Sequence, residues 1–235
     1  MKAILFDLDG TLLPIDVQLF TDEYFRILTE KVGNEEEAKK LCKVIWDSTQ
    51  YMIDTIDENK TNEDCFFEHF NTKIEKVEEA TDILNHFYLN EYTGLKSICK
   101  PNPLARDIIK IVKDKGYELV IATNPLFPKE GINRRVEWAG LDVEDFKLIT
   151  TYENMHYCKP HLKYYEEILS IIDRKPEEVM MVGNDVQEDL VVSELGIKTF
   201  LLEDYKISRE GKIYEPDYKG SYKELYEFVK ELPKL

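Results

Sequence analysis

The chain has 235 residues, enough to bury a sizeable core in one large domain or two smaller ones. Its formal net charge of −16 argues against nucleic acid or an anionic membrane as a partner, because both are bound through basic surfaces. The four cysteines have no metal-binding spacing, and no apolar run approaches membrane-spanning length. We therefore expect a cytoplasmic protein with reduced thiols, and any site for a phosphorylated substrate must be made locally positive by metal and lysine.

The first stretch of the chain predicts a buried strand that ends in two aspartates. Ala3–Phe6 is a short apolar run, Asp7 and Asp9 follow it, and Gly10 lets the chain leave the strand. Two carboxylates at a buried strand end repel each other, so they need a cation, and Mg²⁺ is the natural partner for oxygen ligands. The alternative is an acidic turn in which Asp9 and Gly10 only make the bend.

The region from about Phe20 to Tyr92 has a helical pattern and no strand pattern. Breaks at Gly33-Asn34 and at residues 57–59 divide it into three to five helices, which we expect to pack as a small bundle. Asp16, Gln18 and Tyr24 lie at the start of this helical region, soon after the first strand, and could face a cleft. We expect them to lie on solvated surface instead. The frequent aromatic residues are expected to form the bundle core rather than a ligand site: Trp46, Tyr51, Phe66, Phe67, Phe70, Phe87 and Tyr88.

After residues 100–103, where two prolines end the helical region, apolar strand patterns alternate with helical ones. Residues 203–220 are expected to form a loop or a small hairpin. The alternation predicts an α/β fold with a doubly wound parallel sheet. We predict a core domain of residues 1–14 and 101–235, into which a helical domain of residues 15–100 is inserted. The expected strands are 119–122, 148–150, 179–182 and 199–202, and the expected helices are 104–112, 132–139, 165–172, 190–195 and 225–232.

Polar residues gather where the predicted strands end. Thr123 and Asn124 follow one strand, Asp185 and Asp189 follow another, and Lys159 precedes a helix. Ligands bind beyond the carboxyl ends of the strands in a doubly wound sheet, so these residues predict a common site with Asp7 and Asp9. Taken singly each has a simpler explanation: a helix cap, a solvated cation or a turn.

These residues together resemble the four motifs of the haloacid dehalogenase (HAD) superfamily. Asp7-Leu8-Asp9-Gly10-Thr11-Leu12 resembles the first motif, Ile121-Ala122-Thr123-Asn124 the second and Lys159-Pro160 the third. Val182-Gly183-Asn184-Asp185 through Asp189 resembles the fourth, with one extra residue between glycine and aspartate, which leaves open which carboxylate reaches the metal. The resemblance implies a Rossmann-like HAD core and identifies the helical insert as a C1-type cap.

The resemblance also implies roles. Asp7 would be the nucleophile that forms an aspartyl-phosphate, and Asp9 the general acid and then the base. Mg²⁺ would be held by Asp7, Asp9, Asp185 and Asp189, the last as a ligand or as a partner of the ligands. Phosphoryl oxygens would be held by Thr123 and by the chain around Gly10, Thr11 and Asn124, and Lys159 would neutralise negative charge. Dehalogenating and phosphonate-cleaving members lack an aspartate at the position of Asp9, so the resemblance favours phosphoryl chemistry.

The function expected on these grounds is a Mg²⁺-dependent phosphatase of a small phosphorylated metabolite. Two alternatives stay open: a sugar-phosphate mutase with the same core, and a catalytically silent binding or regulatory protein. The expected assembly is a monomer or a homodimer.

Overall fold

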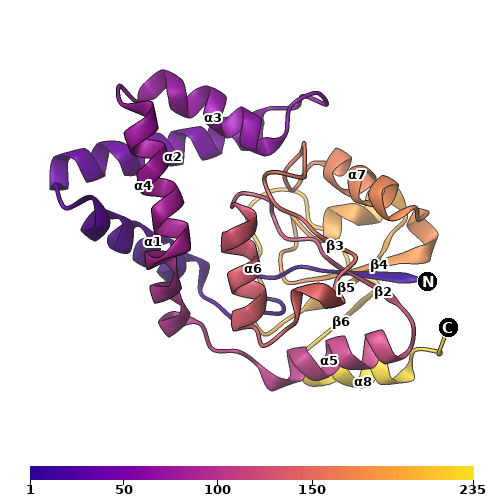
Figure 1. Ribbon diagram of the computed structural model, residues 1–235. Coiled ribbons are helices and arrows are strands. Elements are labelled where there is room, and N and C mark those ends of the chain that lie inside the picture. Colours follow the sequence, from indigo (N-terminus) through magenta and orange to yellow (C-terminus); the bar gives the residue numbers. More distant parts are fainter.

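The computed structural model describes residues 1–235 and has a six-stranded parallel sheet beside a group of helices (Figure 1). The strand order is β3-β2-β1-β4-β5-β6. The chain moves outward from β1 in one direction as far as β3 and then returns to start β4 on the other side of β1. The predicted doubly wound sheet is confirmed. Its strands are β1 (Ala3–Phe6), β2 (Glu118–Ile121), β3 (Leu148–Ile149), β4 (Val179–Gly183), β5 (Lys198–Leu202) and β6 (Tyr218–Gly220).

Strand β1 is buried on both faces, as its uninterrupted apolar sequence predicts. Its Ile4 and Phe6 side chains join the larger apolar core, whereas Ala3 and Leu5 join the core on the opposite face. Both α5 (Pro103–Asp114) and α8 (Tyr222–Glu231) cover the first face, where they pack side by side, and α7 (Leu162–Ile172) covers the second (Figure 1).

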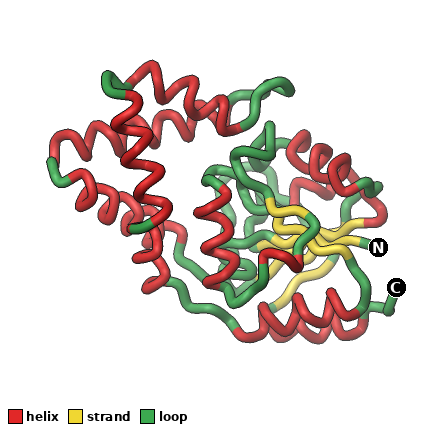
Figure 2. Tube along the Cα trace, in the orientation of Figure 1, coloured by secondary structure: helices red, strands yellow, loops and turns green.

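Residues 17–98 contain helices only (Figure 2). Local signals set their ends: Asp16 caps α1, left-handed Gly33 ends it, and Asn34 caps α2 ahead of three glutamates. The helices are α1 (Val17–Val32), α2 (Glu35–Asp54), α3 (Asn62–Lys73), α4 (Val77–Leu89) and the 3₁₀ helix η1 (Glu91–Ile98). None of the helices in the structure combines the length and the apolar character needed to cross a membrane.

Helix α3 connects the helical segment to the part of the molecule that contains the sheet. The backbone N–H of Asn62 donates to the carbonyl of Met155 at 2.8 Å, and that of Glu63 donates to the carbonyl of Tyr152 at 2.8 Å. A third bond of 3.2 Å runs from the Asn62 side-chain amide to the carbonyl of Tyr157. These bonds place the first turn of α3 over the loop that follows β3.

Two predicted elements differ from those observed. The possible hairpin within residues 203–220 is wrong, because β6 pairs in parallel with β5, and a hairpin pairs its strands antiparallel. The predicted helix at residues 190–195 is the 3₁₀ helix η4 (Leu190–Leu195). It is followed by Gly196 in a left-handed conformation. The remaining elements are α6 (Lys129–Trp138), η2 (Val143–Asp145) and η3 (Pro176–Glu178).

Candidate active site

The candidate site lies where the strand order reverses. Phe6 at the end of β1 is level with Ile121 of β2 and Val182 of β4, so all three strands end together. Asp7 follows β1, Thr123 lies just after β2, and Asn184 follows β4. Because a parallel sheet leaves a crevice at this switch point, the polar residues predicted from the sequence meet there.

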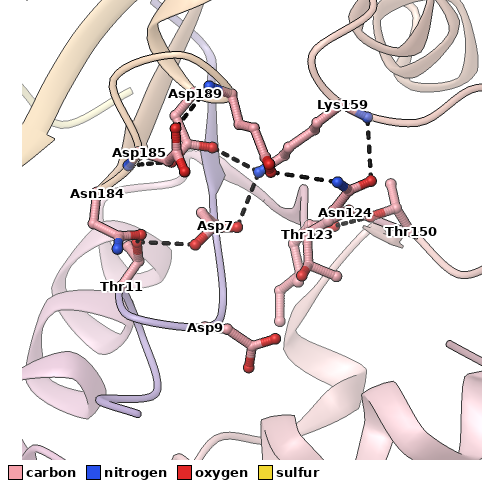
Figure 3. A network of polar contacts seen from close by, with 12 residues as sticks. Asp7, Asp9, Thr11, Thr123, Asn124, Thr150, Lys159, Asn184, Asp185 and Asp189 are labelled. Atoms are coloured by element: carbon pink, nitrogen blue, oxygen red, sulfur yellow. Dashed lines mark hydrogen bonds and ion pairs between the residues drawn. The ribbon is translucent and has the colours of Figure 1, made fainter. Parts of the chain in front are cut away.

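Lys159 stands at the centre of the site and joins two aspartates (Figure 3). Its Nζ lies 2.9 Å from Asp7 Oδ1 and 2.6 Å from Asp189 Oδ1. Asp7 is 8% exposed, Lys159 2% and Asp189 1%, so this is a buried ionic cluster. Two carboxylates share one cation, which leaves the cluster with a net negative charge.

The second oxygen of Asp7 is held by Thr11. The Thr11 hydroxyl lies 3.1 Å from Asp7 Oδ2 and 3.0 Å from Asn184 Oδ1, and Asn184 Nδ2 donates to the carbonyl of Tyr205 at 2.7 Å. Gly10, with φ +86°, makes room for this arrangement, because a Cβ at that position would collide with the Asn184 amide. These contacts fix the plane of the Asp7 carboxylate.

Asp9 does not join the lysine cluster. Its carboxylate pairs with the guanidinium of Arg135, which comes from α6 and is only 2% exposed. The guanidinium also lies 4.4 Å from the centre of the Phe127 ring and 5.5 Å from that of Phe20. Each of the two neighbouring aspartates is therefore paired with a cation of the protein, Asp7 with Lys159 and Asp9 with Arg135.

The two aspartates after β4 have different surroundings. Asp189 Oδ2 accepts from the backbone N–H of Asp185 at 2.9 Å, and Gly183 leaves the space that the Asp189 side chain occupies. The Asp185 carboxylate accepts from the N–H groups of Gln187 and Glu188 at 3.0 and 2.9 Å and pairs with Arg209. No three Asp, Glu, His or Cys side chains converge as a metal-holding group in this arrangement.

Thr123 and Asn124 are part of the same framework. The carbonyl of Thr123 accepts from the Thr150 hydroxyl and from the Tyr164 hydroxyl, both at 2.7 Å. Asn124 Oδ1 accepts from the backbone N–H of Lys159 at 3.2 Å, and its amide group donates to Glu188 at 3.3 Å. Asn124 thus links the loop after β2 to the loop that carries the lysine.

A pocket of about 750 Å³ opens from Asp7 and Asp9 toward the helical segment. Thr123, Asn124, Asp185 and Asp189 also line it. The volume is within the range of about 300–1,000 Å³ that is typical of sites for small molecules. Residues of the first, second and fourth motifs therefore line one common cavity. Lys159, from the third motif, is buried behind it.

A family model described as haloacid dehalogenase-like hydrolase matches residues 1–191. The chain belongs to this family. The HAD resemblance drawn from the four motifs is confirmed, and the protein is an enzyme of the hydrolase class. A fold of six parallel strands flanked by helices agrees with that membership.

Curated relatives of this HAD hydrolase are named pyrophosphatase PpaX. The protein from Anoxybacillus flavithermus is 25% identical over 219 residues, which cover 93% of this chain and 91% of the relative. The protein from Bacillus cereus strain B4264 is 24% identical over 222 residues, which cover 94% of this chain and 91% of the relative.

Solved structures with the same fold include a HAD phosphatase from Thermococcus onnurineus. It has a TM-score of 0.61, 21% identity and full coverage of both chains. A predicted phosphoglycolate phosphatase from Haemophilus somnus has a TM-score of 0.58 at 16% identity and covers 97% of this chain and 98% of its own. L-2-haloacid dehalogenase from Xanthobacter autotrophicus has a TM-score of 0.59 at 15% identity, with 99% coverage of each chain. The last two names belong to different chemistries, so the fold alone does not choose between them.

Burial and neighbouring charges shift the pKa values of the hydrolase's site residues. Burial raises the pKa of Asp9 above its ordinary value; the Arg135 charge opposes this shift and the Asp7 charge adds to it. Burial also raises the pKa of Asp189 to about 7, against the opposing effect of Lys159. Burial disfavours the charged form of Lys159, but Asp189 and Asp7 outweigh it and hold the lysine pKa well above its usual value.

Sequence reasoning missed Arg135, Arg209 and the place of Tyr24. Ile132, Arg135, Val136 and Ala139 recur at helical spacing, so an arginine on the buried stripe of a helix was a usable signal for a buried ion pair. Arg209 belongs to a loop without a motif and had no such signal. Tyr24, expected as solvated surface, is buried and lines the pocket, whereas Asp16 caps α1.

Proposed function

We propose that this HAD hydrolase is a Mg²⁺-dependent phosphatase of a small phosphorylated metabolite, with Asp7 as its nucleophile. The observation that carries the proposal is the buried Asp7 carboxylate, which opens on the pocket while Lys159 and Thr11 hold its two oxygens. These two contacts hold the Asp7 carboxylate in one orientation, as an oxygen nucleophile requires. Relatives named pyrophosphatases and neighbours that include named phosphatases also support phosphoryl chemistry.

In the first step, an Asp7 oxygen attacks phosphorus in line with the ester bond. A P–O bond to Asp7 forms, the ester P–O bond breaks, and the leaving oxygen takes a proton from Asp9. Burial raises the pKa of Asp9 above its ordinary value against the opposing Arg135 charge, which brings the group closer to the proton affinity that a general acid needs. Asp9 lines the pocket on the side of the helical segment, where the leaving group would lie.

In the second step, water hydrolyses the aspartyl-phosphate. Asp9, now a carboxylate, accepts a proton from the attacking water, the bond between phosphorus and Asp7 breaks, and inorganic phosphate leaves. Lys159 stabilises negative charge on Asp7 and on the transferring group throughout. Thr123 and Asn124 shape the phosphoryl end of the pocket.

The residues present fit Mg²⁺, which prefers hard oxygen ligands. Asp7 and Asp185 both line the pocket and offer carboxylate oxygens to it. Asp7, Asp185 and the main chain at Asp9 would hold the ion, with Asp189 behind them. When bound, the ion would screen the charge between nucleophile and phosphate.

We also propose that residues 15–100 act as a cap domain on a core of residues 1–14 and 101–235, and that the enzyme works in the cytoplasm. The pocket between the strand ends and helices α1 to α4 supports the cap assignment, because closing it would exclude water during attack. Three buried cysteines and one half-buried one, all free, suit a reducing compartment.

The test is phosphate release from a panel of phosphate esters and pyrophosphate with Mg²⁺, with EDTA as the metal control. Asp7→Asn should lower kcat by at least about 10⁴-fold, because an amide is no nucleophile. Asp107→Asn, an exposed aspartate on α5, is the matched control and should keep full activity. Release that survives Asp7→Asn, or no release from any substrate, would refute the proposal.

A further inference from the structure

Aromatic rings from the helical segment and from the loops after the strands line the pocket. Six of them come from α1, α3, α4 and the loops after β2 and β3: Tyr24, Phe66, Phe67, Tyr88, Phe127 and Tyr152. The expectation that the aromatic residues form the core of the helical bundle holds for Phe70 and Phe87, which are fully buried. It also holds for Phe66, which is buried in the same core and lines the cavity as well, whereas Phe67 and Tyr88 are half-buried rings that line the cavity. It is wrong for Trp46 and Tyr51, which are exposed.

The rings support one another rather than lying loose in the cavity. The Tyr24 ring centre lies 5.9 Å from that of Phe127, and its hydroxyl lies 2.9 Å from the hydroxyl of Tyr88. Tyr152 lies 6.4 Å from Phe66 and 6.5 Å from Phe67 between ring centres. Such a wall presents flat, apolar surface in a fixed orientation, which suits a flat apolar group.

Acidic residues accompany these rings in the pocket lining. Glu63, Glu130 and Glu153 line it, and burial together with Glu153 raises the pKa of Glu63. The only basic residues of the lining are Arg135 and Arg209, and each is paired with an aspartate of the site. An anionic leaving group would therefore meet repulsion without a free cation to offset it.

We infer that the preferred substrate of this enzyme is a phosphate monoester whose alcohol carries a flat apolar group without negative charge. The inference rests on the proposed phosphatase activity and concerns the leaving-group half of the same pocket. It separates this chain from its relatives named pyrophosphatases, since the group that leaves pyrophosphate is itself an anion. Aromatic contact and the acidic lining both select against such a small anionic group.

Three pairs of substrates test the two features separately. Benzyl phosphate is compared with ethyl phosphate; both release an uncharged primary alcohol, so the difference reports the ring. Burying a ring is worth about 10–100-fold, which we expect in kcat/KM. The cationic 4-(aminomethyl)benzyl phosphate is compared with the anionic 4-carboxybenzyl phosphate, and we expect the cation to be preferred by about 10-fold or more. Pyrophosphate against benzyl phosphate completes the set.

Variants assign each preference to its residues. Tyr152→Leu should reduce the benzyl-over-ethyl ratio, whereas Tyr51→Ala, an exposed tyrosine of α2 outside the pocket, should leave it unchanged. The double variant Glu63→Gln/Glu130→Gln should reduce the cation-over-anion ratio and keep the preference for benzyl. Because Glu130 is exposed and Glu63 only half-buried, this second test does not depend on a core substitution.

Binding separates failure of the inference from failure of the proposed function. Affinities of benzylphosphonate and ethylphosphonate, which carry no ester bond, are measured by calorimetry. Preferred binding of benzylphosphonate without turnover of any ester would overturn the phosphatase and leave the pocket inference standing. If kcat/KM for ethyl phosphate or for pyrophosphate equals or exceeds that for benzyl phosphate, the inference is overturned and the proposed phosphatase activity stands. Equal binding of the two phosphonates without any turnover would overturn both.

Discussion

Arg135 reaches from α6 to Asp9 and is the cation that accompanies this aspartate in the folded enzyme. Its guanidinium is covered by the Phe127 ring at 4.4 Å, and its Nε and Nη2 atoms have no hydrogen-bond acceptor. The arginine is thus held by one ion pair and by aromatic packing. Because α6 follows the loop after β2, the position of Asp9 depends on two separate parts of the core.

Replacing this arginine should destabilise the fold and impair the reaction. Arg135→Met leaves the Asp9 carboxylate buried without its partner, and breaking such a pair costs about 3–5 kcal/mol. We expect that loss in urea unfolding, together with a lower kcat, because Asp9 loses the group that positions it.

Arg134→Met is the matched control for that change. Arg134 is half-buried, with its side chain 43% exposed, and lies 3.7 Å from Glu137, a surface pair worth about 0–1 kcal/mol. Equal losses of stability in the two variants would contradict the role given to Arg135. Arg135→Lys should recover part of the stability and less of kcat, since lysine lacks the planar group that packs on Phe127.

Gly10→Ala tests the packing behind Asp7. The residue has φ +86°, and an added Cβ would displace the Asn184 amide that bonds to Thr11. Gly33→Ala has a similar φ of +76° with nothing within 4 Å of the new Cβ, so it reports the backbone cost alone. We expect about 1 kcal/mol for Gly33→Ala in urea unfolding, and more for Gly10→Ala with a kcat at least about 10-fold lower. Identical stability and activity in both variants would refute a role for the Asn184 contact.

The Lys2–Glu178 pair should make stability depend on pH. Hydrogen bonding to Lys2 and to the backbone of Lys175 lowers the pKa of Glu178 to about 2. A carboxyl whose folded pKa is depressed stabilises the fold above its unfolded pKa of about 4.5 and loses that contribution as the pH falls toward 2. The difference in Tm between the wild type and Glu178→Gln should therefore narrow from about pH 5 to about pH 3.

Glu177→Gln is the control for the acid titration, because this neighbouring glutamate is exposed and takes part in no ion pair or hydrogen bond of the structure. Its Tm should follow that of the wild type at each pH. A difference for Glu178→Gln that stays constant across the same range would rule out the proposed linkage.

Thiol reactivity should follow burial. Cys42 is half-buried and the other three cysteines are buried. Burial raises the pKa of Cys99 to about 11 and raises those of Cys65 and Cys158 as well, which keeps the three as unreactive thiols near neutral pH. We expect one thiol to react quickly with Ellman's reagent in the native protein, and all four after unfolding. If the fast-reacting thiol is absent from Cys42→Ser, that thiol is Cys42. Several fast-reacting thiols in the native wild type would contradict the burial of Cys65, Cys99 and Cys158.

Features that depend on local sequence pattern could be predicted before the structure was known. Continuous apolar runs indicated strands buried on both faces, and the alternation of strands and helices indicated the parallel sheet. Motif spacing at the strand ends brought together Asp7, Lys159 and Asp189, because parallel strands all end at one edge of the sheet. Helix caps such as Asn34 and the prolines after residue 100 set the ends of the elements.

The pairing of charges in the site, in contrast, depends on contacts between segments that lie far apart in the chain. The sequence indicated that Asp7 and Asp9 need positive charge nearby, but the pairing of Asp9 with Arg135 depends on how α6 lies against β1. A long-range ion pair leaves no periodic signal, as Arg209 shows, and an aromatic residue in a helix follows the same spacing whether it faces a core or a cavity. Tyr24 and Phe67 line the pocket because α1 and α3 dock over the strand ends, and that docking follows from packing among distant segments that no short stretch of sequence encodes.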